Sequence, residues 1–164
     1  MSSTARVRLL VSVVALLAVG GVTGAAASPP APASGAFTYT SATFNSIRSA
    51  GGNTIIDLTA TVSYTGTFSG TSTVQGTLII HADGSANFND VETFTGTVSG
   101  VPGTVTFKLT GRNDSAGVIR ATDAIVGATG ELAGLHGVLT EVGTVPSLNG
   151  PAGTYSGQIQ FGSP

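Results

Sequence analysis

Acidic side chains stand among apolar ones in a segment with the pattern of a β-strand, Ala86–Val98. Successive residues of a strand point to opposite faces, so side chains two residues apart share a face. One face of this segment therefore carries Phe88, Asp90, Glu92, Phe94 and Val98. A carboxyl group among aromatic rings loses contact with water, which raises its pKa toward values that suit proton transfer.

Asp123 has the same setting, because it alternates with apolar residues in the segment Val118–Val126. Glu92 and Asp123 are therefore the candidate catalytic residues. The alternative is that these acids lie at the rim of the fold, where they are solvated or paired with Arg112 or Arg120. Buried carboxylates without a partner are rare, and this favours the rim.

Histidine and serine offer no further chemistry. His81 and His136 form no paired spacing of the kind that binds metals, and the chain has no cysteine. No serine stands in the Gly-x-Ser-x-Gly pattern of a nucleophile elbow. The sequence therefore predicts no metal site and no cofactor, and it gives no support to a hydrolase triad.

Alternating apolar and polar residues recur along the chain after residue 36, and no window there shows sustained helical periodicity. Glycine, asparagine and aspartate mark the turns between eight strand-like segments. The segments are Phe37–Ile47, Thr54–Thr65, Ser72–His81, Ala86–Val98, Thr104–Arg112, Val118–Val126, Val138–Thr144 and Thr154–Phe161. Their connections are too short for crossover helices. The predicted fold is all-β, an eight-stranded antiparallel barrel.

The interior of an eight-stranded barrel holds packed side chains or one small ligand. Large side chains on the inward faces would form the walls of a ligand cavity. The candidate ligand-binding residues are therefore Tyr64, Phe88, Phe94, Phe107 and Tyr155. The sixth segment is apolar on both faces, which indicates cover from a loop or from a second copy of the chain in a homo-oligomer.

Four glycines crowd the connection Gly127–Gly137, at positions 127, 130, 134 and 137. Between them, Leu132 and Leu135 are three residues apart, a spacing that suits one turn of helix. Glycine readily adopts the positive φ that the chain needs to enter and leave a tight turn. We expect one helical turn in this glycine-rich connection, with the leucine pair buried.

The first 27 residues have the features of a secretory signal peptide. Two arginines precede the apolar run Leu9–Val19, and small residues ending at Ala27 come before Ser28. An uncleaved membrane anchor is the weaker alternative, because the apolar run is short for a bilayer span. The sequence predicts a secreted protein with no stable membrane insertion after cleavage near Ala27-Ser28. A Pro/Ala/Ser-rich tether follows over 28–35, and one barrel domain over 36–164.

Charged residues are scarce and mostly negative. They make up only 9% of the chain, and residues 28–164 contain four basic against eight acidic side chains. No basic patch is available, so the composition argues against nucleic acid as a partner. Threonine, serine and glycine take the place of charged residues, and strands accept threonine readily. This composition fits a secreted β-protein.

Three further motifs follow one another in the order and spacing of a known family. They are Asp83-Gly84-Ser85-Ala86-Asn87-Phe88, Glu92-Thr93-Phe94-Thr95-Gly96 and Gly103-Thr104-Val105-Thr106-Phe107. Together with the glycine-rich connection, they resemble a family of small bacterial proteins of unknown function among the allene oxide cyclase and dirigent-like β-barrels. The resemblance covers about residues 36–161 and implies the barrel. Family members often have a histidine where this chain has Leu109, so chemistry that needs that imidazole has no support here.

Two classes of function fit these observations. The first is a binding module that holds a small apolar molecule in the barrel. The second, implied by the resemblance, is a cofactor-free isomerase, cyclase or dirigent-like protein that steers a reactive intermediate, with Glu92 or Asp123 as its polar group. A third alternative is a surface or matrix protein with a filled barrel. A cavity separates the first two from the third, and a convergent acid and donor inside it favour the second.

Overall fold

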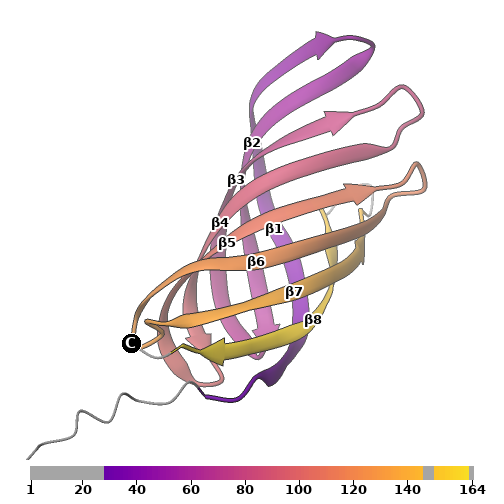
Figure 1. The fold of residues 1–164 in the computed structure, drawn as a ribbon. Helices are drawn as coiled ribbons and strands as arrows, with labels where there is room; N and C mark the ends of the chain where they lie inside the picture. The colour runs from indigo at the N-terminus through magenta and orange to yellow at the C-terminus, as the bar shows by residue number, and fades with distance from the viewer. Residues whose placement is uncertain (1–27, 146–149, 163–164) are drawn as a thin grey trace, which may run out of the picture.

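The computed structural model describes residues 28–145 and 150–162, and in these ranges it contains eight strands and no helix (Figure 1). The strands are β1 (Ala31–Ala50), β2 (Asn53–Gly66), β3 (Phe68–Ile80), β4 (Ala86–Val98), β5 (Val101–Asn113), β6 (Val118–Gly130), β7 (Leu135–Thr144) and β8 (Ala152–Phe161). Each strand pairs with the next in antiparallel orientation, and β8 pairs back onto β1. The hydrogen bonds close a ring, which confirms the predicted all-β, eight-stranded antiparallel barrel.

The start of the barrel lies earlier than the sequence predicts. Residues 1–27, which carry the predicted signal peptide, lie outside the described residues. No helix in the described part of the chain has the length and apolarity needed to cross a membrane.

Ala31–Gly35, expected to belong to the tether, forms the first part of β1 and pairs with β8. Pro32 is tolerated there because β1 has not yet reached its first pair with β2, Gly35 with Gly66, so only one edge of the strand needs backbone donors.

The two ends of the barrel differ in how the strands meet. We call the end with the β2–β3, β4–β5 and β6–β7 turns the closed end, and the opposite end the open end. β1 pairs with β2 over Gly35–Ala50 but with β8 only over Ala31–Thr38. Two register shifts in β1, after Tyr39 and after Phe44, bend the strand. The β1–β2 hairpin therefore extends beyond its neighbours, and the strands spread apart at the open end (Figure 1).

Aromatic rings fill the closed end. Neighbouring rings have centroids 5.4–6.4 Å apart, and the buried members are Phe37, Tyr64, Phe68, Phe94, Phe107 and Tyr155. The Tyr155 hydroxyl accepts a hydrogen bond from the Phe68 N–H at 2.8 Å and donates one to the Thr65 carbonyl at 3.1 Å. Gly35 leaves room for this ring, since a Cβ there would overlap it. We call these six residues the aromatic cluster.

The glycine-rich connection consists of tight turns, and the expected helical turn is wrong. The Ala133 N–H donates to the Gly130 carbonyl at 3.2 Å, and the Leu135 N–H donates to the Leu132 carbonyl at 2.9 Å. Gly130 and Gly134 have φ angles of 72° and 83°. This left-handed backbone conformation prevents a right-handed helix from continuing through either residue. The predicted burial of the leucine pair is confirmed, with Leu132 and Leu135 at most 3% exposed.

The outer face of β6 and β7 is partly apolar. Ile119 and Ile125 point inward and are buried, whereas Val126 is 61% exposed and Val138 on the neighbouring strand is 52% exposed. No loop among residues 28–145 and 150–162 covers these two valines. Cover by a second copy of the chain stays a prediction.

Candidate functional site

A cavity of about 540 Å³ lies at the open end of the barrel. Its walls are mainly apolar and include Phe37, Tyr39, Leu58, Leu78, Phe88 and Ile119, while residues of the β3–β4, β5–β6 and β7–β8 connections surround its mouth. Three acidic residues are also part of the lining, Asp90 and Glu141 on strands β4 and β7 and Asp114 at the mouth. The cavity exists because most inward side chains at this end are aliphatic or small, whereas aromatic rings fill the other end.

Four carboxyl groups face the interior between this cavity and the aromatic cluster. Asp90 and Glu92 come from β4, Asp123 from β6 and Glu141 from β7, and each residue is 1–8% exposed. Each occupies an inward position of its strand, as the alternation with buried apolar neighbours requires. We call these four residues the acid cluster.

The rim position that we considered for these acids does not hold. Arg112 on β5 and Arg120 on β6 lie directly opposite each other, and both are exposed. Since their side chains point outward and the acids point inward, the wall of the barrel separates them. The arginines therefore do not neutralise the acid cluster.

Gly76 provides the space that the Asp90 carboxyl group occupies. The two residues are directly opposite each other on β3 and β4. A Cβ at position 76 would overlap the Asp90 carboxyl group. The carboxyl group thus packs against the backbone of the neighbouring strand at position 76, and Asp90 lines the cavity.

Hydrogen bonds satisfy only part of the acid cluster. The Tyr64 hydroxyl donates to Glu141 Oε1 at 3.2 Å. Glu92 Oε1, Asp123 Oδ1 and the nearby Ser72 Oγ are buried with no hydrogen-bond partner in the described part of the chain. Buried polar atoms almost always have a partner, so three orphaned oxygens in one place are unusual.

Burial raises the pKa of all four acids, because the ionised form loses its hydration. For Asp90, burial and then the charge of Glu92 raise the pKa to about 7. Burial raises the pKa of Glu92, which the hydroxyls of Ser72 and Tyr64 lower in part. Burial also raises the pKa of Asp123, followed by the charge of Glu92, and that of Glu141, followed by the charge of Asp123.

The acid cluster can do two kinds of chemistry. Near neutral pH it holds protons that exposed carboxyl groups would have released, so it can exchange a proton with a molecule in the cavity. Its negative charge, developed in a poorly hydrated interior, can also attract a cation. Asp90 and Glu141 reach the cavity, while Glu92 and Asp123 lie further along their strands toward the closed end and are absent from its lining.

The predicted wall residues separate along the length of the barrel. Phe88 lines the cavity, and Gly111 on β5 leaves room for its ring. The other four predicted residues, Tyr64, Phe94, Phe107 and Tyr155, lie in the aromatic cluster and are absent from the cavity lining. Alternation identifies which face of a strand points inward, but it does not tell how far along the barrel a residue lies.

Sequence reasoning missed Glu141 and Tyr39, both of which line the cavity. Glu141 follows two residues after Leu139 in a predicted strand, which is the same signal that identified Asp123. That signal could have found it. Tyr39 precedes the first register shift of β1, and nothing in the sequence marks that shift.

The histidines have structural partners. His81 lies 3.0 Å from both Asn53 Oδ1 and Asn87 Nδ2, and His136 Nε2 lies 2.6 Å from Gln160 Nε2. Within residues 28–145 and 150–162, no group of three or more histidines and acids has an arrangement that could hold a metal ion.

Comparison with known proteins agrees with the fold. The family model "Protein of unknown function (DUF3224)" matches residues 33–144. The crystal structure of a protein with unknown function from the DUF3224 family of Shewanella oneidensis MR-1 aligns with a TM-score of 0.65 and 19% identity, over 81% of this chain and 98% of that one. At this identity the likeness shows the fold alone. No curated protein matches the sequence.

The predicted membership in a family of unknown function is confirmed, while the wider placement among allene oxide cyclase-like barrels stays a prediction. The family match spans β1 to β7 and includes the three quoted motifs and the glycine-rich connection. The chain belongs to the DUF3224 family.

Proposed function

We propose that this chain binds a small, mainly apolar molecule in the cavity at the open end of the barrel. The cavity carries the proposal: its volume of about 540 Å³ lies within the range of roughly 300–1,000 Å³ that is typical of small-molecule sites. Aliphatic and aromatic walls favour an apolar ligand, because binding removes apolar surface from water at about 25 cal/mol per Å². A barrel filled by its own side chains would leave no such space.

A neutral dye tests this proposal. Nile red, whose emission rises in apolar surroundings, is titrated into the purified protein. We expect saturable binding that Leu78→Trp weakens about tenfold or more, because the indole would occupy the cavity that Leu78 lines. Val138→Trp is the matched control, since Val138 is exposed on the outer wall. Absence of binding, or equal binding by both variants, would contradict the proposal.

A second function, a cofactor-free isomerase or cyclase, is favoured by one observation. Asp90 faces the cavity with a pKa of about 7, which suits a group that both gives and takes a proton near neutral pH. On this alternative Asp90 or Glu141 would act on the ligand. Glu92 and Asp123, the catalytic candidates from the sequence, would raise the pKa of these two residues through their charges.

Mass spectrometry of small molecules that copurify with the protein tests the second function. The recovered compound is returned to the protein in D₂O, and deuterium uptake at carbon is followed. An isomerase that works by proton transfer catalyses this exchange, and Asp90→Asn slows it about a hundredfold or more. A compound that binds but takes up no deuterium would leave only the binding function.

We further propose that the protein acts outside the cytoplasm, exported by residues 1–27. All eight strands follow the predicted cleavage point, and Ser28 beside it is hydrogen-bonded to Phe161 at the end of β8. Cleavage would therefore leave the barrel whole. N-terminal sequencing of protein from the culture medium should begin near Ser28, and a start at Met1 would contradict export by cleavage.

A further inference from the structure

We propose that the ligand of this cavity is a protonated amine, an apolar body with an ammonium group that binds at Asp90 and Glu141. This inference rests on the proposed binding function and names its ligand class. It begins from the unequal distribution of charge in the barrel: the described interior contains four carboxyl groups and no basic side chain.

The basic side chains of the described residues are all elsewhere. Arg48, Lys108, Arg112 and Arg120 are exposed on the outside, and Arg48 already forms an ion pair with Asp57. His81 and His136 are engaged at opposite ends of the barrel with asparagine and glutamine side chains. None of these six residues lines the cavity.

The groups that face the acid cluster from the other strands cannot neutralise it. β1 contributes Tyr39, β2 contributes Tyr64, β8 contributes Tyr155, and β3 contributes the Ser72 hydroxyl. The inward side chains of β5 in this region are apolar. At the mouth, Asp114 adds another acid, although its Oδ1 accepts hydrogen bonds from the N–H groups of Ala116 and Val118.

The unpartnered oxygens behind the cavity lining, in the same acid cluster, favour a cation as well. Glu92 and Asp123 are 1% and 2% exposed, and one oxygen of each has no hydrogen-bond partner among the described residues. An uncompensated buried carboxylate is strongly unfavourable. A cation next to Asp90 and Glu141 would stabilise the ionised form of the whole acid cluster, since the four groups already interact with one another electrostatically.

An ammonium group fits better than a metal ion or an anion. No group of three or more histidines and acids among the described residues is arranged to hold a metal ion, and the carboxylates of the lining would repel an anion. The remaining walls are apolar, with the rings of Phe37, Tyr39 and Phe88 among them. Such rings accommodate hydrocarbon and attract cations through their π faces. The N–H groups of an ammonium ion provide the donors that the carboxyl groups lack.

A matched series of ligands tests the inference. Octylamine, octanol and octanoate are compared at pH 7 for displacement of Nile red from the protein. We expect octylamine to bind about tenfold or more tightly than octanol, as one charge-assisted hydrogen bond provides, and octanoate to bind most weakly. Asp90→Asn and, separately, Glu141→Gln should bring the ratio between octylamine and octanol close to one. Asp57→Asn, on the outer wall, should leave this ratio unchanged.

Proton release gives a second measurement. Binding of an ammonium ion lowers the pKa of the carboxyl groups beside it, so protons leave the protein. Calorimetric titration of octylamine at pH 6.5 in two buffers of different ionisation enthalpy should detect this release, and octanol should cause none.

The outcomes separate the inference from the function on which it rests. If Nile red binds and octanol displaces it as well as octylamine does, the inference of an amine ligand is wrong, while the proposed binding of an apolar molecule in the cavity stands. If Nile red does not bind, the proposed function fails, and the inference fails with it. An octylamine preference that survives both Asp90→Asn and Glu141→Gln overturns the assignment of the ammonium group to these carboxyls.

Discussion

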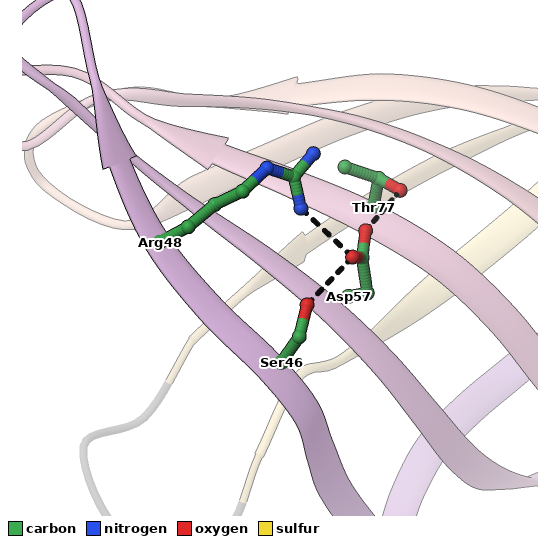
Figure 2. Close-up of polar contacts among 4 residues, drawn as sticks. All are labelled: Ser46, Arg48, Asp57 and Thr77. Carbon is green, nitrogen blue, oxygen red and sulfur yellow. Dashed lines mark hydrogen bonds and ion pairs between the residues drawn. The ribbon is translucent and has the colours of Figure 1, made fainter.

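Carboxyl groups on the outside and on the inside of the barrel differ in their hydrogen bonds and in the direction of their pKa shifts. On the outside, Asp57 of β2 accepts hydrogen bonds from Ser46 at 2.7 Å, from Arg48 at 2.9 Å and from Thr77 at 2.8 Å (Figure 2). Its pKa is lowered, first by Ser46 and then by Thr77 and Arg48. Inside, the Tyr64 hydroxyl donates to Glu141 of the acid cluster, the hydroxyls of Ser72 and Tyr64 offset only part of the rise in the Glu92 pKa, and the pKa of all four acids is raised.

This difference shows which carboxyl group has its hydrogen-bonding capacity satisfied in the folded chain. Asp57 joins side chains of three neighbouring strands, with Ser46 and Arg48 on β1 and Thr77 on β3. Its contacts are complete in the folded chain. The acid cluster is incomplete, because buried oxygens lack donors, and such groups destabilise the folded state. A destabilising arrangement at the base of a cavity is typical of a binding or catalytic site.

The largest effect is expected for Asp90→Asn, which should change how the free energy of unfolding depends on pH. The pKa of Asp90 is about 7 in the folded state and about 4 in an unfolded chain. Between these values the folded state binds more protons, so the free energy of unfolding falls as pH rises from about 4 to about 7. We expect Asp90→Asn to be roughly 2–4 kcal/mol more stable than the parent at pH 8 and equal to it near pH 4.

Chemical denaturation at pH 4, 6 and 8 measures this difference. Glu131→Gln is the control, because Glu131 is an exposed acid in the β6–β7 turn, and it should follow the parent at every pH. A parent protein that becomes steadily more stable between pH 4 and 8 would contradict the idea that the acid cluster is deprived of solvent and partners.

Sequence patterns were enough for the barrel and for the strand face on which its acids lie, but the preference for an exposed rim position was wrong, since these acids are buried. Strand β4 has the predicted bounds, Ala86–Val98, because period-two alternation is strong there and a turn signal stands at each end. The inward position of Glu92 also followed from parity alone. The rarity of buried carboxylates in proteins had argued for the rim, and this general expectation failed for the acid cluster.

The cavity could not be predicted from the sequence. Its shape depends on how far β1 remains paired with β8, and the two register shifts in β1 have no signature in the residues around Tyr39 and Phe44. Depth along the barrel depends on the stagger between strands, which local alternation does not report. For this reason Tyr64 and Phe88 looked equivalent in the sequence, although one packs in the aromatic cluster and the other lines the cavity.

Gly76→Ala tests whether the position of Asp90 depends on the neighbouring strand. The added methyl would overlap the Asp90 carboxyl group, so we expect a loss of roughly 1–3 kcal/mol at pH 5, as overpacking of a filled interior typically causes. Combining it with Asp90→Ala should recover most of the loss, because the clashing group is gone. A double variant whose free energy of unfolding equals the sum of the two single effects would show that the two positions are not coupled.

Gly130→Val gives a change that should not depend on pH. Gly130 has a φ of 72°, which a β-branched residue adopts only with strain, so a loss of roughly 1–3 kcal/mol is expected at pH 4 and at pH 8 alike. Gly134→Val, with φ of 83°, should behave in the same way. Thermal melts of both variants at the two pH values provide the measurement. A loss that changed with pH would mean that these turns are linked to the acid cluster, and the contrast between backbone and charge effects would fail.

Asp57→Asn should have the smallest effect and the opposite dependence on pH. The folded-state pKa of Asp57 is lowered, so its contribution to stability is present above the unfolded value of about 4 and disappears as pH falls through the folded value. We expect the variant to melt slightly below the parent at pH 7 and together with it near pH 2. The effect is small because solvent screens exposed ion pairs, and Arg48 and Asp57 are 55% and 39% exposed at their side chains. Thermal melts of the parent, Asp57→Asn and Asp90→Asn across the same pH series would place the two carboxyl environments side by side. If Asp57→Asn raised the melting temperature at pH 7, as Asp90→Asn should, the outer carboxylate would be as poorly satisfied as the inner ones. The distinction between a structural acid and a functional one would then be lost.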